Sequence, residues 1–98
     1  MNFKGLIFIF LHLGKDCIVK QEDIVGIFDM DTTTVSKISR DFLKFCEKRK
    51  QVVNVSFELP KSFVITCENG EMRVYISQLS PATLEKRASS KFGLQENI

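Results

Sequence analysis

Basic residues recur at helical spacing in the middle of this chain. They form a basic stripe, defined here as Lys37, Arg40, Lys44 and Lys48, which Arg49 and Lys50 extend. Positions three or four apart share one side of an α-helix, so these cations are predicted to lie side by side. Such a stripe can bind nucleic-acid phosphates, because each neutralised phosphate releases counterions. A solvated helix face is the alternative that the sequence leaves open.

The overall charge adds little support to the stripe. Fourteen Lys and Arg residues against twelve Asp and Glu leave a formal net charge of +2 over 98 residues. A weakly basic balance does not by itself imply nucleic-acid binding, so the clustering of the cations must carry that prediction.

Catalysis has little support in the sequence. The one histidine, His12, alternates with Phe8 and Phe10 in an apolar run and is expected to be a packed or interfacial residue. No serine or cysteine lies in a nucleophile-elbow context, and the five glycines are isolated, so no phosphate-binding loop is indicated. We therefore expect no enzyme and no small-molecule substrate.

Cysteine usage argues against a metal site. Cys17, Cys46 and Cys67 are odd in number and widely spaced, with no CxxC pair. We expect reduced, mostly buried thiols in a cytoplasmic protein, and neither a cofactor nor a metal. Asp29 and Asp31 are expected to serve in turns and caps.

The strongest structural pattern is a hairpin from Ser62 to Ser77. Asn69-Gly70 lies between two alternating runs, and a type I′ turn requires two residues that tolerate positive φ. A two-residue loop fixes the register. It pairs Phe63 with Ile76, Ile65 with Val74, and Cys67 with Met72 on an apolar face, and Val64 with Tyr75 and Thr66 with Arg73 on the other face.

The other elements follow from apolar patterning. Apolar runs on both faces predict strands covered on two sides by a helix or another subunit. The expected strands are Ile7–Leu13, Cys17–Val19, Ile24–Phe28 and Val52–Val55, and the expected helices are Thr33–Arg49, which carries the stripe, and Ala82–Arg87. Ser80 is the predicted N-cap of the second helix, with Pro81 at its first position.

These elements predict an α+β fold with a small antiparallel or mixed sheet, one main helix and a short C-terminal helix. Residues 1–87 are expected to form a single domain, and 88–98 a flexible tail. The apolar run that starts near Gly5 has no small-residue cleavage site after it and is too short to cross a bilayer as a helix. We therefore expect a buried first strand there and no membrane partner.

Five short segments match a known family in their order and spacing. They read FLHLG at 10–14, DIVGIFD at 23–29, LPKSFV at 59–64, YIS at 75–77 and SPATLEKR at 80–87. On these segments the chain resembles the bacterial extracellular matrix regulators, in particular the RemB branch related to RemA. The resemblance runs from about residue 10 to residue 87, and residues 1–9 extend beyond the usual start.

The resemblance implies a cytoplasmic transcription regulator of biofilm-matrix genes. RemA-like relatives form rings and bind double-stranded DNA through basic residues repeated around the ring, so that many weak phosphate contacts add. A homo-oligomer is therefore expected. The candidate DNA-binding residues of this chain are Lys37, Arg40, Lys44, Lys48 and Lys61.

Two positions depart from the RemA-like pattern. Those relatives place an arginine before the strand that begins here at Ile24, where this chain has Asp23. They also carry an arginine-rich loop before Phe63, where Lys61 is the only cation of this chain. The alternative is therefore a protein-interaction module, for example a partner of a RemA-like regulator, that does not bind DNA.

Overall fold

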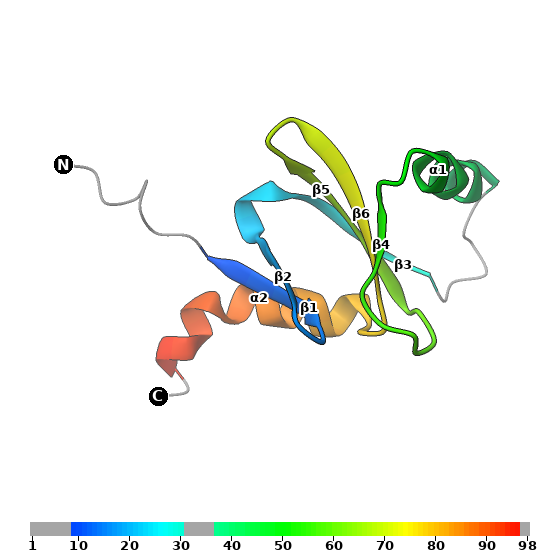
Figure 1. Ribbon diagram of the computed structural model, residues 1–98. Coiled ribbons are helices and arrows are strands. Elements are labelled where there is room, and N and C mark those ends of the chain that lie inside the picture. The colour runs from blue at the N-terminus through cyan, green and yellow to red at the C-terminus, as the bar shows by residue number, and fades with distance from the viewer. Residues whose placement is uncertain (1–8, 31–36, 97–98) are drawn as a thin grey trace.

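The computed structural model describes residues 9–30 and 37–96, which form an α+β fold of two helices and two sheets (Figure 1). The predicted fold class is confirmed. The elements are β1 (Phe10–Gly14), β2 (Cys17–Lys20), the 3₁₀ turn η2 (Gln21–Asp23), β3 (Ile24–Asp29), α1 (Lys37–Lys48), β4 (Val52–Asn54), β5 (Ser62–Glu68), β6 (Glu71–Ser77) and α2 (Pro81–Glu96).

The hairpin of β5 and β6 has the predicted register throughout, from Ser62 opposite Ser77 to Glu68 opposite Glu71. Asn69 has φ 53° and Gly70 has φ 82°, as a type I′ turn requires. The two-residue loop therefore sets the alignment of the central strand pair.

The main sheet has the strand order β3-β5-β6-β4. β4 runs parallel to β6, while the other pairs are antiparallel, so β3 and β4 run in the same direction at opposite edges. Parallel strands need a crossover connection, and α1 lies within the segment that joins β3 to β4. This connection carries α1 across one face of the sheet.

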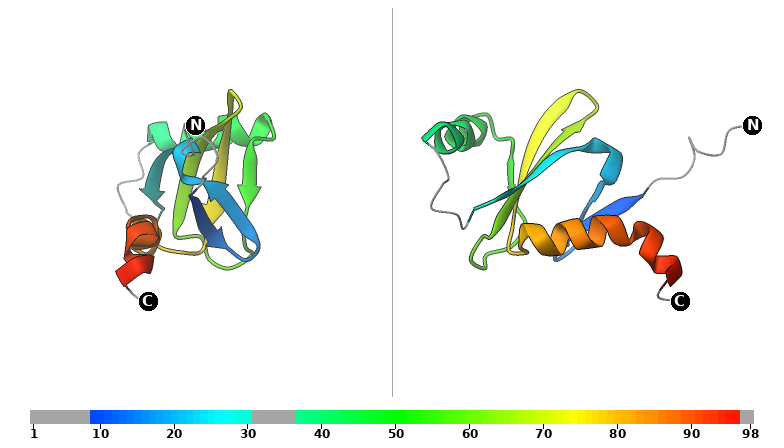
Figure 2. Two further views of the ribbon diagram at one scale, coloured as in Figure 1. Left: turned by 90° about the vertical axis from the view of Figure 1, so that its left-hand side faces the viewer. Right: turned by 180° about the vertical axis from the view of Figure 1, so that it is seen from behind.

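Both faces of the main sheet are covered (Figure 2). On the α1 side, Cys46 packs with Phe63 and Val74. On the other side, β1, β2 and α2 form a second core that includes Leu11, Val64 and Leu84. The hairpin face predicted to be apolar is thus only one of two buried faces, and at the hairpin tip its members Cys67 and Met72 are exposed.

Within the single chain the first three strands are not covered on both sides, so their predicted cover by another subunit stays a prediction. β1 buries Leu11 and Leu13, but the side chains of Phe10, Ile18 and Val25 on β1, β2 and β3 are exposed. A two-stranded hairpin packed on one side of a core leaves its outer face to solvent or to another molecule. The part of the predicted first strand before residue 9 lies outside the described residues.

The predicted helix boundaries agree with the structure at some helix ends and differ at others. α1 ends at Lys48, one residue before the predicted end, and its predicted start at Thr33 lies outside the described residues. Ser80 caps α2 as expected, since its Oγ accepts a hydrogen bond from the Thr83 backbone N–H at 3.1 Å. The predicted end of α2 at Arg87 is wrong, because the helix continues to Glu96 where a tail was expected. Residues 88–96 contain no proline and several good helix formers, which sustain a helix without apolar periodicity.

Candidate nucleic-acid interface

Helix α1 presents its basic residues on the side that faces away from the sheet. Cys46 is 1% exposed and packs against β5 and β6, and Phe42 and Leu43 are partly buried beside it. The side chains of Arg40, Lys44 and Lys48 are exposed, as the helical spacing predicts for the opposite side. Lys37 begins α1, but its side chain lies outside the described part. Packing of α1 on the sheet thus leaves the described members of the stripe at the surface.

The stripe continues into the turn that ends α1. The Lys50 N–H donates to the Glu47 carbonyl at 3.0 Å, and the Gln51 N–H donates to the Cys46 carbonyl at 2.9 Å. This pair of bonds is a Schellman motif, in which Lys50 adopts the left-handed conformation with φ 59°. The Arg49 guanidinium lies over the Phe45 ring at 5.3 Å from its centroid. The turn therefore fixes two more cations at one end of α1.

A cleft of about 690 Å³ opens beside this turn. Arg49 and Lys50 line it from the end of α1, and Glu71 and Arg73 line it from β6 next to the hairpin tip. Val52 pairs with Val74, so the start of β4 brings the turn to the hairpin end of the sheet (Figure 1). Arg73 forms an ion pair of 3.7 Å with Glu71. The structure thus adds Arg73 to the basic surface, a residue that the helical spacing could not indicate.

Lys61 lies apart from the other candidates. It precedes Ser62, which pairs with Ser77, whereas Arg73 pairs with Thr66 toward the hairpin tip. Five residues of extended chain separate Lys61 from Thr66, which places Lys61 and Arg73 roughly 17 Å apart along the sheet. The side chain of Lys61 is exposed, but the fold does not bring it to the basic stripe.

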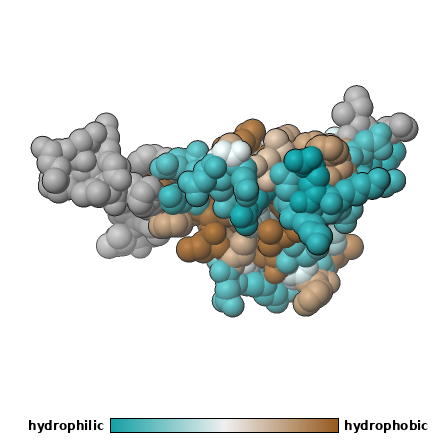
Figure 3. Space-filling view, turned by 45° about the horizontal axis from the view of Figure 1, so that its top comes forward, coloured by the Kyte–Doolittle hydropathy of each residue, from teal (hydrophilic) through white to brown (hydrophobic). Residues whose placement is uncertain are grey.

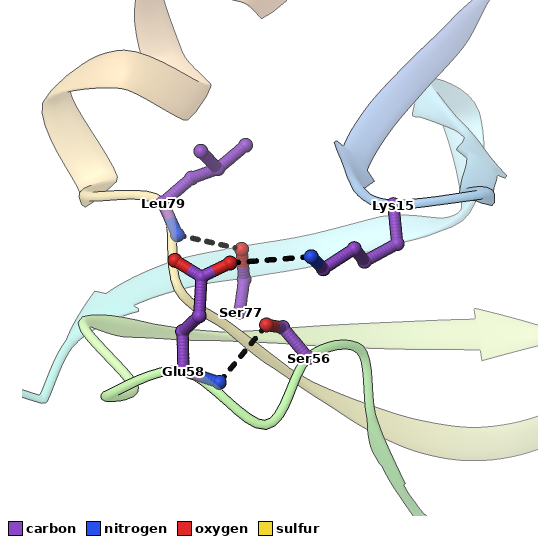
Figure 4. A network of polar contacts seen from close by, with 5 residues as sticks. All are labelled: Lys15, Ser56, Glu58, Ser77 and Leu79. Carbon is purple, nitrogen blue, oxygen red and sulfur yellow. Dashed lines mark hydrogen bonds and ion pairs between the residues drawn. The ribbon is translucent and has the colours of Figure 1, made fainter.

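The loop between β4 and β5 that contains Lys61 exposes two large apolar side chains. Phe57 is fully exposed and Leu59 is 75% exposed. Glu58 anchors the loop to the β1–β2 turn through an ion pair of 3.2 Å with Lys15, and the Glu58 N–H donates to Ser56 Oγ at 3.0 Å (Figure 4). The space-filling view shows hydrophobic residues lying between hydrophilic ones on one face of the molecule (Figure 3).

A polar cluster stabilises the hairpin beneath the basic cleft. The hydroxyls of Thr66 and Tyr75 each donate to Glu68 Oε2 at 2.6 Å. Burial acts to raise the pKa of Glu68, but these two hydrogen bonds and the charge of Arg73 outweigh it and lower that pKa overall. Burial and the bond to Glu68 raise the pKa of Tyr75. The cluster therefore keeps an ionised carboxylate near Arg73.

The remaining candidate residues, His12 and the three cysteines, lie in surroundings typical of structural side chains. His12 is exposed, its Nε2 contacts the Lys15 carbonyl, and Arg87 lies 3.2 Å from its Nδ1. All three cysteines are free, but only Cys46 is buried, while Cys17 is half-buried and Cys67 is exposed. Burial raises the pKa of the Cys46 thiol despite the opposing charge of Arg49. Among the described residues, no group of three or more His, Cys, Asp or Glu side chains could hold a metal ion.

The described helices also bear on membrane association. None of them is both long and apolar enough to span a bilayer.

The fold and the basic surface define a small α+β protein whose helix α1 covers one face of the sheet and presents cations outward. Residues 10–88 match the RemA-like family, extracellular matrix regulatory protein A-like. The chain is also 45% identical over 83 residues to extracellular matrix regulatory protein B of Bacillus subtilis (strain 168). The aligned region covers 85% of this chain and 94% of that protein. The chain belongs to the RemA-like family of extracellular matrix regulatory proteins.

Proposed function

We propose that this protein is a DNA-binding transcription regulator of extracellular matrix genes that acts in the cytoplasm. The observation that carries the proposal is the exposed side of α1. Arg40, Lys44 and Lys48 lie together on the side of the helix that faces away from the core. Family membership supplies the regulatory context, and three free thiols are compatible with a reducing compartment. In this proposal the protein acts by binding, without catalysis.

The proposed contacts are to the phosphate backbone. Lysine and arginine side chains neutralise phosphates and release counterions, but such contacts carry no base sequence information directly. A subunit with a net charge of +2 binds weakly by itself. In an oligomer the α1 face would be repeated in every subunit. Once one subunit binds DNA, the others are held near the duplex at a high effective concentration, so their weak contacts add.

Self-association is part of this proposal. β3 and β4 are the two edges of the main sheet, and their outer backbone groups can pair with another strand. Exposed apolar side chains lie on or near these edges, at Val25 and Phe28 on β3 and at Phe57 and Leu59 after β4. We expect sedimentation at micromolar concentration to give a mass well above that of the 11.2 kDa chain. A monomer under those conditions would contradict the oligomeric part of the proposal.

The test of DNA binding is a titration of a fluorescent duplex with the wild-type protein at several salt concentrations. We expect the logarithm of the association constant to fall linearly with the logarithm of salt concentration, for both AT-rich and random duplexes. Absence of binding at low salt would refute the proposal.

A second function is favoured by the apolar loop between β4 and β5. Phe57 and Leu59 are exposed in this loop, and Phe57 lines a hollow of about 300 Å³ together with Pro60 and Ile76. Here the chain would be a protein-interaction module whose partner is a RemA-like regulator. Replacing both apolar residues with serine should then abolish co-purification with that regulator and leave the melting temperature of the free protein unchanged, because both side chains are exposed. If the double variant keeps the partner, this second function is wrong.

A further inference from the structure

We propose that the cleft between the end of α1 and the hairpin tip is a discrete seat for one phosphate group of the DNA backbone. Arg49, Lys50 and Arg73 line this cleft from two elements that are distant in sequence. Convergent cations in a concave site hold an anion more specifically than cations on a flat face, and guanidinium groups match phosphate oxygens in a bidentate geometry. The inference rests on the proposed function and assigns it a defined contact.

The backbone of Lys50 supports a role beyond helix termination. Its position in the Schellman motif favours glycine, because only glycine adopts positive φ without steric cost. Here a lysine adopts φ 59° and lines the cleft. Residues in sparsely populated backbone conformations cluster at functional sites, which supports a binding role for Lys50 beside the geometry of the cleft.

The charge balance of the cleft favours an anion. Glu71 is the carboxylate of the lining, and it lies 3.7 Å from Arg73. Arg73 also faces the carboxylate of Glu68, so its charge is partly neutralised. The helix C-terminus adds a partial negative charge of about half an elementary charge. Arg49 and Lys50 exceed these remaining negative charges and leave the cleft cationic.

The position of the cleft fits a continuous track for one DNA strand. Lys44 and Lys48 lead along α1 to Arg49, and the cleft begins there. In this arrangement the stripe contacts successive phosphates from the surface, and the cleft receives one phosphate at the end of the track. Lys61, at the opposite end of the strands, lies off this track.

The test uses the full chain and two matched variants, Lys50→Gly and Lys15→Gly. Both lysines have positive φ, so glycine relieves backbone strain and removes one charge in each case. Lys15 lies in the β1–β2 turn, paired with Glu58 and away from the cleft. Both variants are expected to melt at or above the wild-type temperature, so a loss of binding would not reflect unfolding.

The readout is the salt dependence of duplex binding. We expect Lys50→Gly to reduce the slope by about 0.9 per engaged subunit, which corresponds to roughly eightfold weaker binding at 0.1 M salt. Lys15→Gly should leave slope and affinity unchanged, and that difference would support the cleft. If the wild type binds duplex and both variants bind equally well, the inference is wrong and the proposed function stands. If the wild type binds no duplex, both are wrong.

A second arm distinguishes the source of the phosphate. The same proteins are titrated with ATP in place of DNA, followed by calorimetry. Weak or undetectable binding of ATP is expected, because a backbone phosphate in the cleft is held together with its neighbours on α1. Tight, saturable binding of ATP that Lys50→Gly abolishes would assign the cleft to a free nucleotide and overturn its assignment to the DNA backbone.

Discussion

Replacing Lys44 and Lys48 with glutamine should weaken duplex binding and leave the fold intact. Both side chains are exposed on α1, opposite the buried Cys46, so neither contributes to the core. Each phosphate contact contributes about 0.9 to the slope of log affinity against log salt for duplex DNA. The double variant should therefore lose about 1.8 in slope for each engaged subunit. Between 1 M and 0.1 M salt this difference accumulates to roughly 60-fold weaker binding.

The matched control removes the same charge from the other side of the molecule. Lys15 and Lys86 are exposed in the β1–β2 turn and on α2, which cover the sheet face opposite α1. Fluorescence anisotropy at four or more salt concentrations gives the slope for each protein, and circular dichroism checks folding. The Lys15 and Lys86 double variant should keep the wild-type slope. An equal loss of slope in both double variants would show that net charge matters and the α1 face does not. An unchanged slope in the Lys44 and Lys48 variant would refute the assignment of phosphate contacts to α1.

Three further predictions concern the stability and the thiols of the protein. Asn69→Val and Gly70→Val should each cost roughly 1–3 kcal/mol, because valine disfavours the positive φ of the type I′ turn, and wild-type melting temperatures would show the turn assignment to be wrong. Tyr75→Phe should cost about 2 kcal/mol at pH 7 by removing a hydrogen bond to the ionised Glu68, which lowers Tm by roughly 8–16 °C. Because folding lowers the pKa of Glu68, its contribution to stability is present above the unfolded pKa of 4.5 and is lost as pH falls through the folded pKa. The difference in Tm between Tyr75→Phe and wild type should therefore shrink at pH 3. A difference in Tm that stays constant with pH would contradict the role of this cluster. The three cysteines should bind no zinc, and stoichiometric zinc in protein purified without added metal, measured by atomic emission, would disprove this.

The hairpin could be predicted because its information is local. Asn69-Gly70 specifies the turn type, the turn type specifies the register, and the register assigns every side chain to a face. The sequence does not reveal that β4 adds to β6 in parallel, because that pairing joins residues far apart in the chain, such as Val52 and Val74. The same limit explains the burial of Val64 and Tyr75, whose cover comes from β1, β2 and α2.

The candidate site was predictable to the extent that it lies on one helix. Helical spacing alone places Arg40, Lys44 and Lys48 on a common exposed side. The cleft depends on Arg73, which reaches Lys50 only through the pairing of β4 with β6. Lys61 is a candidate only through the family resemblance, as the cation of the loop before Phe63, and the length of β5 separates it from the other cations.

The most direct test of the central claim is a lysine-labelling footprint of the full-length protein with and without duplex DNA. Acetylation at each lysine is quantified by mass spectrometry at low salt. The account predicts protection of Lys44, Lys48 and Lys50, with Lys15 and Lys86 labelled equally in both samples. Protection confined to Lys61, or no protection at any lysine while the duplex is bound, would contradict the claim that α1 is the DNA-binding surface.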